Sequence, residues 1–97
     1  MDELAEQFEA QLWHTVEEAL TEGYAPRRFE QMLRDHGGVQ AAKLLIASGD
    51  IQYGLERLAE LDRLDISLER VMLRPEFEPL FTQDELAAAR WRLSQVQ

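Results

Sequence analysis

The sequence contains no cysteine, and this absence excludes several kinds of chemistry at once. Disulfides, thiolate zinc sites, iron–sulfur clusters and thiol nucleophiles all require cysteine. A chain without cysteine fits a cytoplasmic protein, and we expect that location. The acidic start, Met1-Asp2-Glu3, agrees with this, because a secretory signal would begin with basic residues.

Long apolar runs and basic residues are also scarce. No apolar run reaches the roughly 18 residues that a membrane-spanning helix needs. Ten Lys and Arg stand against 19 Asp and Glu, which gives a formal charge of −9. An acidic chain of this kind is repelled by phosphate backbones and by anionic lipid. We therefore expect no membrane association and consider nucleic-acid binding unfavourable, since no predicted helix carries a basic run.

What is present fits one small globular domain. The chain has 97 residues, 45% of them hydrophobic, and neither a linker nor an internal repeat divides residues 1–97. Apolar residues recur at helical spacing, as in Leu4, Phe8, Leu12, Val16 and Leu20. The pattern predicts an all-α, compact single domain of five to six short helices. The expected helices cover about 2–22, 26–36, 39–47, 51–61, a short segment after Ser67, and 83–96.

Local signals mark several of the expected helix ends. Asp50 and Ser67 are suitable N-caps, and Thr82 with Glu85 three residues later forms a capping-box pattern. The alternation of Leu64, Ile66 and Leu68 could also indicate a strand. We favour a turn there, because a lone strand would have no partner.

Several of these punctuating residues occur together in a recognisable order. They are Gly23-Tyr24-Ala25-Pro26, Gly37-Gly38-Val39, Arg63-Leu64-Asp65-Ile66-Ser67, Leu73-Arg74-Pro75 and Phe81-Thr82. Over nearly its whole length the chain resembles a small all-helical bacterial domain of unknown function, found alone or attached to larger proteins. The resemblance implies a bacterial, helical protein and supplies no catalytic residue.

The two histidines are the first candidates for chemistry. His14 has Glu17 and Glu18 on the same helix face, a spacing that occurs in metal-binding bundles, but the second copy that such sites need is missing. The alternative is a solvated ion pair. In Asp35-His36-Gly37-Gly38, an Asp–His pair precedes a helix N-terminus that could hold an anion, or the glycines could simply end one helix and start the next. We expect no catalytic residue, no metal site and no cofactor.

Charge is concentrated at the start of the chain. Residues 1–22 hold seven acids and no Lys or Arg. This surface could be merely solvated, or it could be a docking face for a basic partner that includes Glu17 and Glu18. Arg27 and Arg28 fall in the first turn of their helix, where Glu22 or Glu30 could offset their charge; otherwise the pair could contact an anion or a partner.

Aromatic residues outside the apolar stripes are the strongest functional signal. In the last helix the predicted buried residues are Leu86, Ala89, Leu93 and Val96. Trp91 then points away from the core, next to Ala87 and Ala88. Tyr53 likewise opposes the apolar side of its helix. Exposed Trp is typical of a protein contact, although the helix could instead be buried on two sides, or the connector 77–81 could cover it.

These observations predict a non-enzymatic protein-interaction module, an adaptor or a small regulatory subunit. Its partner would be another protein or a second copy of the chain. The expected contact residues are Trp91, Ala87, Ala88, Tyr53, Glu17 and Glu18. The alternative is an acidic inhibitor or nucleic-acid mimic, whose carboxylates would occupy a basic site on another protein.

Overall fold

The fold is all-α, as the hydrophobic spacing predicted. The computed structural model describes residues 2–48 and 53–97, and the side chain of Tyr53 also lies outside the described part. Within these ranges the chain forms six α-helices, two short 3-10 helices and no strand. Their order is α1 (Glu3–Thr21), α2 (Arg27–His36), α3 (Gly38–Ala47), α4 (Tyr53–Glu60), η1 (Leu64–Ile66), α5 (Leu68–Met72), η2 (Glu78–Leu80) and α6 (Gln83–Val96).

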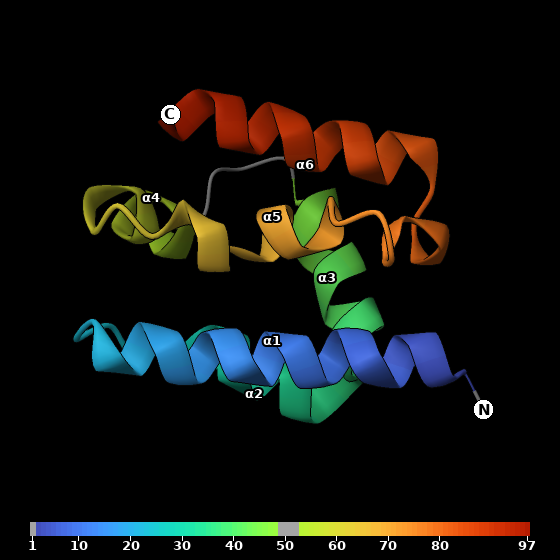
Figure 1. The fold of residues 1–97 in the computed structure, drawn as a ribbon, viewed down its shortest axis with the longest axis horizontal. Helices are drawn as coiled ribbons and strands as arrows, with labels where there is room; N and C mark the ends of the chain where they lie inside the picture. Colours follow the sequence, from blue (N-terminus) through green and yellow to red (C-terminus); the bar gives the residue numbers. More distant parts are fainter. Residues whose placement is uncertain (1, 49–52) are drawn as a thin grey trace.

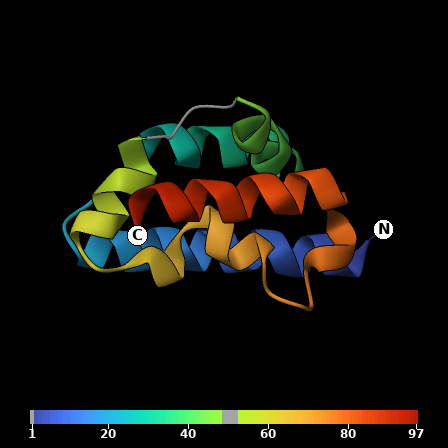
Figure 2. The ribbon, with the colours of Figure 1, turned by 90° about the horizontal axis from the view of Figure 1, so that it is seen from above.

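The two longest helices form opposite sides of the molecule. Figure 1 shows α1 and α6 running in the same direction, with α3 and α5 between them. Seen from above, α2 and α3 lie on one side of α6, α5 lies on the other, and α4 lies beside the C-terminal end of α6 (Figure 2). Helix α3 contacts α1, α2 and α6, and α5 contacts α1 and α6. The Cα radius of gyration is 12.3 Å, close to the ~12.5 Å of a compact chain of this length.

Side-chain caps fix several helix starts. The Asp2 carboxylate accepts from Leu4 N–H at 3.0 Å, and Ser67 Oγ accepts from Arg70 N–H at 3.2 Å. At α6 the Thr82 Oγ1 accepts from Glu85 N–H at 3.1 Å, while Glu85 Oε1 accepts from Thr82 N–H at 2.9 Å. The predicted caps at Ser67 and Thr82 are therefore confirmed. The predicted cap Asp50 lies outside the described residues.

The main core is built on the aromatic residues of α1 and of the connector before α6. Phe8 packs edge-to-face on Phe77 and Phe81, with ring centroids 5.3 and 5.2 Å apart. Leu12, Val16 and other buried apolar residues extend this cluster toward α3 and α6. A smaller cluster of Ala19, Leu58 and Ile66 joins the end of α1 to α4 and η1.

Two details of the sequence prediction need correction. The apolar spacing predicts that Leu20 is buried in the first helix, but Leu20 is 48% exposed. Apolar residues spaced by four advance by about 40° at each step around an α-helix, so Leu20 lies about 120° from Phe8. Val96, expected to be buried, is only partly so at the end of α6. The segment Leu64–Ile66 is a 3-10 turn, as favoured, and not a strand.

Candidate functional site

The outer face of α6 has the geometry that its sequence pattern predicts. Leu86, Ala89 and Leu93 are buried, whereas Trp91 is 50% exposed. Ala87, one turn before Trp91, is exposed as well. Ala88 is partly buried and packs against the core, so it contributes less to the surface than we expected. We call Trp91, Ala87 and the exposed edge of Ala88 the Trp91 face.

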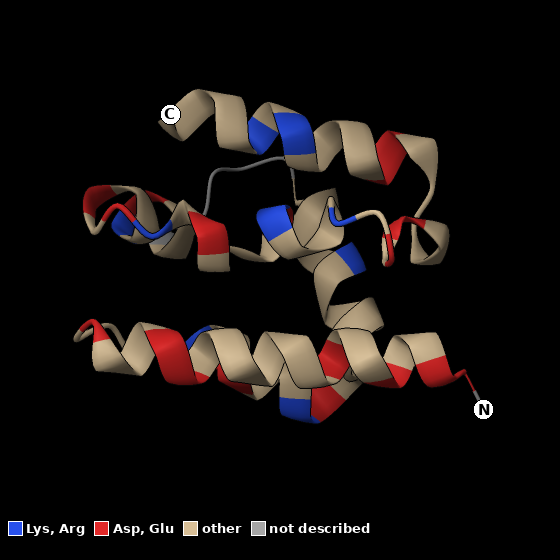
Figure 3. Cartoon of the chain, in the orientation of Figure 1, with Lys and Arg blue, Asp and Glu red and all other residues tan. Residues whose placement is uncertain are grey.

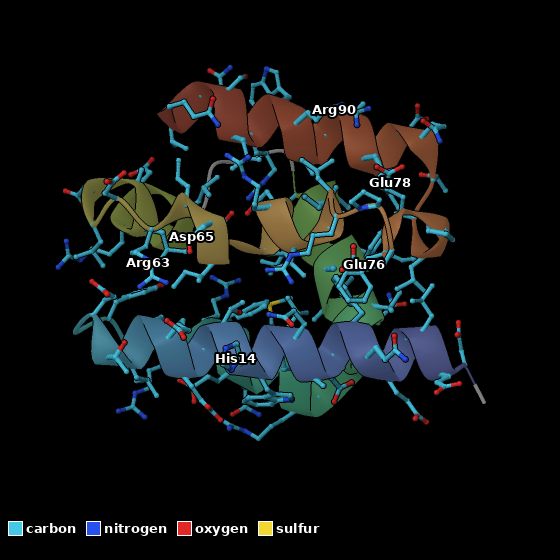
Figure 4. All side chains as sticks on the ribbon, viewed as in Figure 1. His14, Arg63, Asp65, Glu76, Glu78 and Arg90 are labelled. Atoms are coloured by element: carbon cyan, nitrogen blue, oxygen red, sulfur yellow. The ribbon has the colours of Figure 1, made fainter. Side chains whose placement is uncertain are left out.

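The connector between α5 and α6 does not bury the Trp91 indole. We considered that residues 77–81 could fold over this ring. Instead, Phe77 and Phe81 turn toward Phe8 of α1. Arg90 lies on the outer side of α6 (Figure 4), so the apolar indole and a cation share the exposed surface of this helix. The prediction for Tyr53 falls on a side chain outside the described part of the structure.

The acidic surface of α1 is used in part by the protein itself. Arg63 donates to Glu22 at 2.9 Å, to Asp65 at 3.1 Å and to Glu18 at 3.2 Å. Figure 4 shows Arg63 and Asp65 on the side of their segment that faces α1. Glu18, predicted to meet a partner, is therefore committed to an internal ion pair, whereas Glu17 is exposed.

The ion-pair cluster around Arg63 shifts two pKa values. Hydrogen bonding to Asp65, Glu18 and Glu22 raises the pKa of the Arg63 guanidinium above its ordinary range. The hydrogen bond from Arg63 also holds the pKa of Asp65 below its usual value. Both shifts favour the charged forms, so the cluster is a persistent link between the end of α1 and the segment before α5.

The histidine candidates have structural explanations. His14 Nε2 lies 3.6 Å from Glu18 Oε1, and the His14 side chain is 61% exposed. This is the solvated ion pair that the sequence offered as the alternative to a metal site. At the second candidate, Gly37 adopts a φ of +79°, which favours glycine. The Gly38 N–H at the start of α3 donates to Glu9 Oε1 at 2.9 Å. The anion at this helix N-terminus is thus a carboxylate of the chain itself.

Arg27 and Arg28 do not form the expected ion pairs. Glu22 binds Arg63 instead. In the described ranges, neither arginine has an acidic oxygen within 4.0 Å, and both are exposed. In the same part of the chain no group of three or more His, Cys, Asp or Glu residues could hold a metal ion. The described helices also include none that is long and apolar enough to span a bilayer.

A buried ion pair is the main feature that the sequence analysis missed. Arg92 Nε donates to Glu69 Oε2 at 2.8 Å, and the side chains are 1% and 5% exposed. The position of Arg92 gave a usable signal, because it follows Ala89 by three residues and lies within the apolar stripe. Glu69 gave no comparable signal. It follows the partly buried Leu68 in α5, and the five residues of this helix are too few for apolar spacing to show which side is buried.

The same ion pair borders a cavity at the centre of the molecule. The cavity has a volume of about 310 Å³ and is lined from all six α-helices, the loop before α2 and the η1 turn. Most of its wall is apolar, and Val16, Phe29 and Leu58 are among the lining residues. Nothing in the hydrophobic pattern indicated it, because a cavity depends on how the helices fit together.

No family model matches the sequence, and comparisons with curated proteins and with solved structures found no match. The resemblance to a small bacterial domain therefore stays a prediction.

Proposed function

We propose that this chain is a non-enzymatic protein-interaction module, an adaptor or a small regulatory subunit, that binds its partner through the Trp91 face. The observation that carries the proposal is the 50% exposure of Trp91 on an otherwise well-packed helix. A large aromatic side chain left in water loses favourable burial, which a partner can restore, and Trp is enriched at the energetic centres of interfaces. Its helix is capped and packs through Leu86, Ala89 and Leu93, so it presents the indole as a rigid anchor.

The partner that fits best is a different protein with an apolar groove and a net positive charge. The chain carries a formal charge of −9, so a basic partner is attracted and a second copy is repelled. Figure 3 shows acidic residues distributed over α1 and near the start of α6. Glu17 belongs to this exposed acidic surface and would steer the encounter. The lack of cysteine agrees with a role in the cytoplasm.

The alternative, an acidic inhibitor or nucleic-acid mimic, has less support. A mimic needs carboxylates that are free to meet basic groups of its target. Glu9, Glu18 and Glu22 of α1 are instead engaged with Gly38 N–H and with Arg63. Asp2 is also occupied as the cap of α1.

The test is affinity capture with the tagged wild-type chain and with Trp91→Ala. Leu44→Ala is the matched control, because Leu44 of α3 is also a large exposed apolar residue, at 42%. We expect a protein that is retained by wild type and L44A to be lost with W91A. Since half of the residue already lies in water, W91A should cost well below the ~3–5 kcal/mol of a buried Trp.

Three outcomes would contradict the proposal. Equal recovery of every bound protein by W91A and wild type would show that the indole is not the anchor. A dimer seen by sedimentation, and lost in W91A, would identify a second copy as the occupant of this face. A steep loss of binding with salt, unchanged in W91A, would instead favour the acidic inhibitor.

A further inference from the structure

The central cavity, which is lined from all six α-helices, is not used by the proposed function. It has a volume of about 310 Å³, and Trp91 is not part of its wall. Pockets for small molecules begin at roughly this size. For scale, a dry protein cavity of about 150 Å³ holds benzene. A cavity of twice that volume can accommodate about ten to twelve non-hydrogen atoms.

The wall of the cavity favours an apolar body. Two hydroxyl groups of the wall already have partners, since Thr15 Oγ1 donates to Leu12 C=O at 2.6 Å and Ser67 Oγ donates to Leu64 C=O at 2.7 Å. Most of the remaining wall is apolar side chain from α1, α2, α4 and α5. Such a surface holds water poorly and hydrocarbon well.

The charged residues of the wall favour a ligand with a negative charge. Glu69 and Arg92 form a buried pair at 2.8 Å, so their charges offset one another. Arg28 also lines the cavity, is exposed, and has no acidic oxygen within 4.0 Å among the described residues. Among the described residues, the wall therefore has one excess positive charge, in a chain of net charge −9. Because Arg28 is exposed, it marks a place where the cavity meets solvent.

We propose that this cavity binds a small amphipathic monocarboxylate, with its apolar body among the helices and its carboxylate at Arg28. Arginine is well suited to a carboxylate, because its planar guanidinium presents paired N–H donors. The proposal does not rest on the Trp91 face, so each can fail while the other holds.

The test uses octanoate, which has about the expected size, and 1-octanol as its uncharged counterpart. Calorimetric titration of the whole chain should give saturable one-to-one binding of octanoate. Methyl resonances of Val16, Leu58 and Leu68, which line the cavity, should shift. Arg28→Gln should weaken octanoate binding roughly fivefold and leave 1-octanol binding unchanged. The matched control is Arg27→Gln, since Arg27 is the neighbouring exposed arginine and does not line the cavity.

A second variant tests the location of the apolar body. Ala19 is buried at 3% exposure and lines the cavity, so Ala19→Leu should fill part of the space and abolish binding of both probes. Circular dichroism would establish that A19L is folded, and W91A should bind octanoate like wild type. The proposal is overturned by the absence of saturation up to ~5 mM octanoate. Equal effects of R27Q and R28Q, or undiminished binding by folded A19L, would overturn it as well.

Discussion

Arg92 of α6 and Glu69 of α5 form an ion pair at 2.8 Å that is almost completely removed from water. The pair joins the last helix to the shortest one, and α5 in turn contacts α1. Removing charges from water is costly, so a buried pair of this kind holds the two helices in one relative position more than it adds stability.

We predict that Glu69→Ala destabilises the protein by about 3–5 kcal/mol, because it leaves the Arg92 guanidinium buried without this carboxylate. The double variant Glu69→Met with Arg92→Met should recover most of that loss, since two apolar side chains avoid the desolvation cost. Urea unfolding, monitored by circular dichroism, measures the free energy of unfolding of both variants. A double variant as unstable as E69A would show that the pair itself provides the stability.

The crossing of α1 and α3 depends on a glycine. A Cβ atom added to Gly38 would lie 2.8 Å from the Cα of Glu9, and that backbone atom cannot move without shifting α1. We therefore expect Gly38→Ala to cost about 1–3 kcal/mol in the free energy of unfolding. Gln40→Ala, an exposed position on the same helix, should stay within ~0.5 kcal/mol of wild type. A wild-type melting curve for G38A would contradict the close approach.

The Arg63 cluster predicts a dependence of stability on pH. The pKa of Asp65 is lowered in the folded state by the hydrogen bond from Arg63. This contribution is present above the unfolded pKa of Asp, about 3.9, and is lost as the pH falls through the lower folded pKa. Arg63→Gln should therefore be less stable than wild type at pH 7, and the difference should shrink below pH ~4.

Arg57→Gln is the control for this experiment, because Arg57 makes one ion pair within the described ranges, with Glu60 at 3.8 Å. R57Q should lower the stability of the folded state less than R63Q does at every pH. Thermal melts at a series of pH values, in low and high salt, give the comparison. A difference between R63Q and wild type that is constant down to pH 2 would exclude the carboxylates as its origin.

Glu85 has two roles that one substitution can separate. Its Oε1 accepts from Lys43 Nζ at 2.7 Å and closes the capping box with Thr82. Partial burial raises the pKa of Glu85, but the hydrogen bonds from Lys43 and from Thr82 N–H outweigh it, so the pKa lies below its usual value. The stabilisation is therefore present above an unfolded pKa of about 4.3 and is lost at lower pH.

We predict that Glu85→Gln loses about 0.5–1 kcal/mol at pH 7, because glutamine keeps the capping box but not the ion pair with Lys43. The loss should shrink as the pH falls through the lowered pKa of Glu85, because the wild-type carboxyl then becomes protonated. Asp84→Asn, an exposed acid in the same helical turn, should have a smaller effect. If E85Q destabilised the protein equally at pH 3 and pH 7, the charge of Glu85 and its ion pair with Lys43 would be excluded as the origin of the loss.

The sequence alone determined the features that depend on neighbouring residues. The capping box at Thr82 and the turn at Ser67 need only a few adjacent side chains, and both are present. The exposure of Trp91 also followed from helical periodicity, because the buried residues of α6 fix which side faces water. The all-α class follows from the same spacing repeated along the chain.

The tertiary structure decided every feature that joins distant segments. Glu9 accepts a hydrogen bond from Gly38 at the N-terminus of α3, although the two residues are 29 positions apart in the sequence. Arg63 likewise donates to Glu18, which is 45 positions away. The Glu69–Arg92 pair and the cavity beside it likewise arise where several helices meet. Local spacing fixes which side of a helix is apolar. The partner of each charge, and the space left between the helices, depend on crossing positions that no single segment specifies.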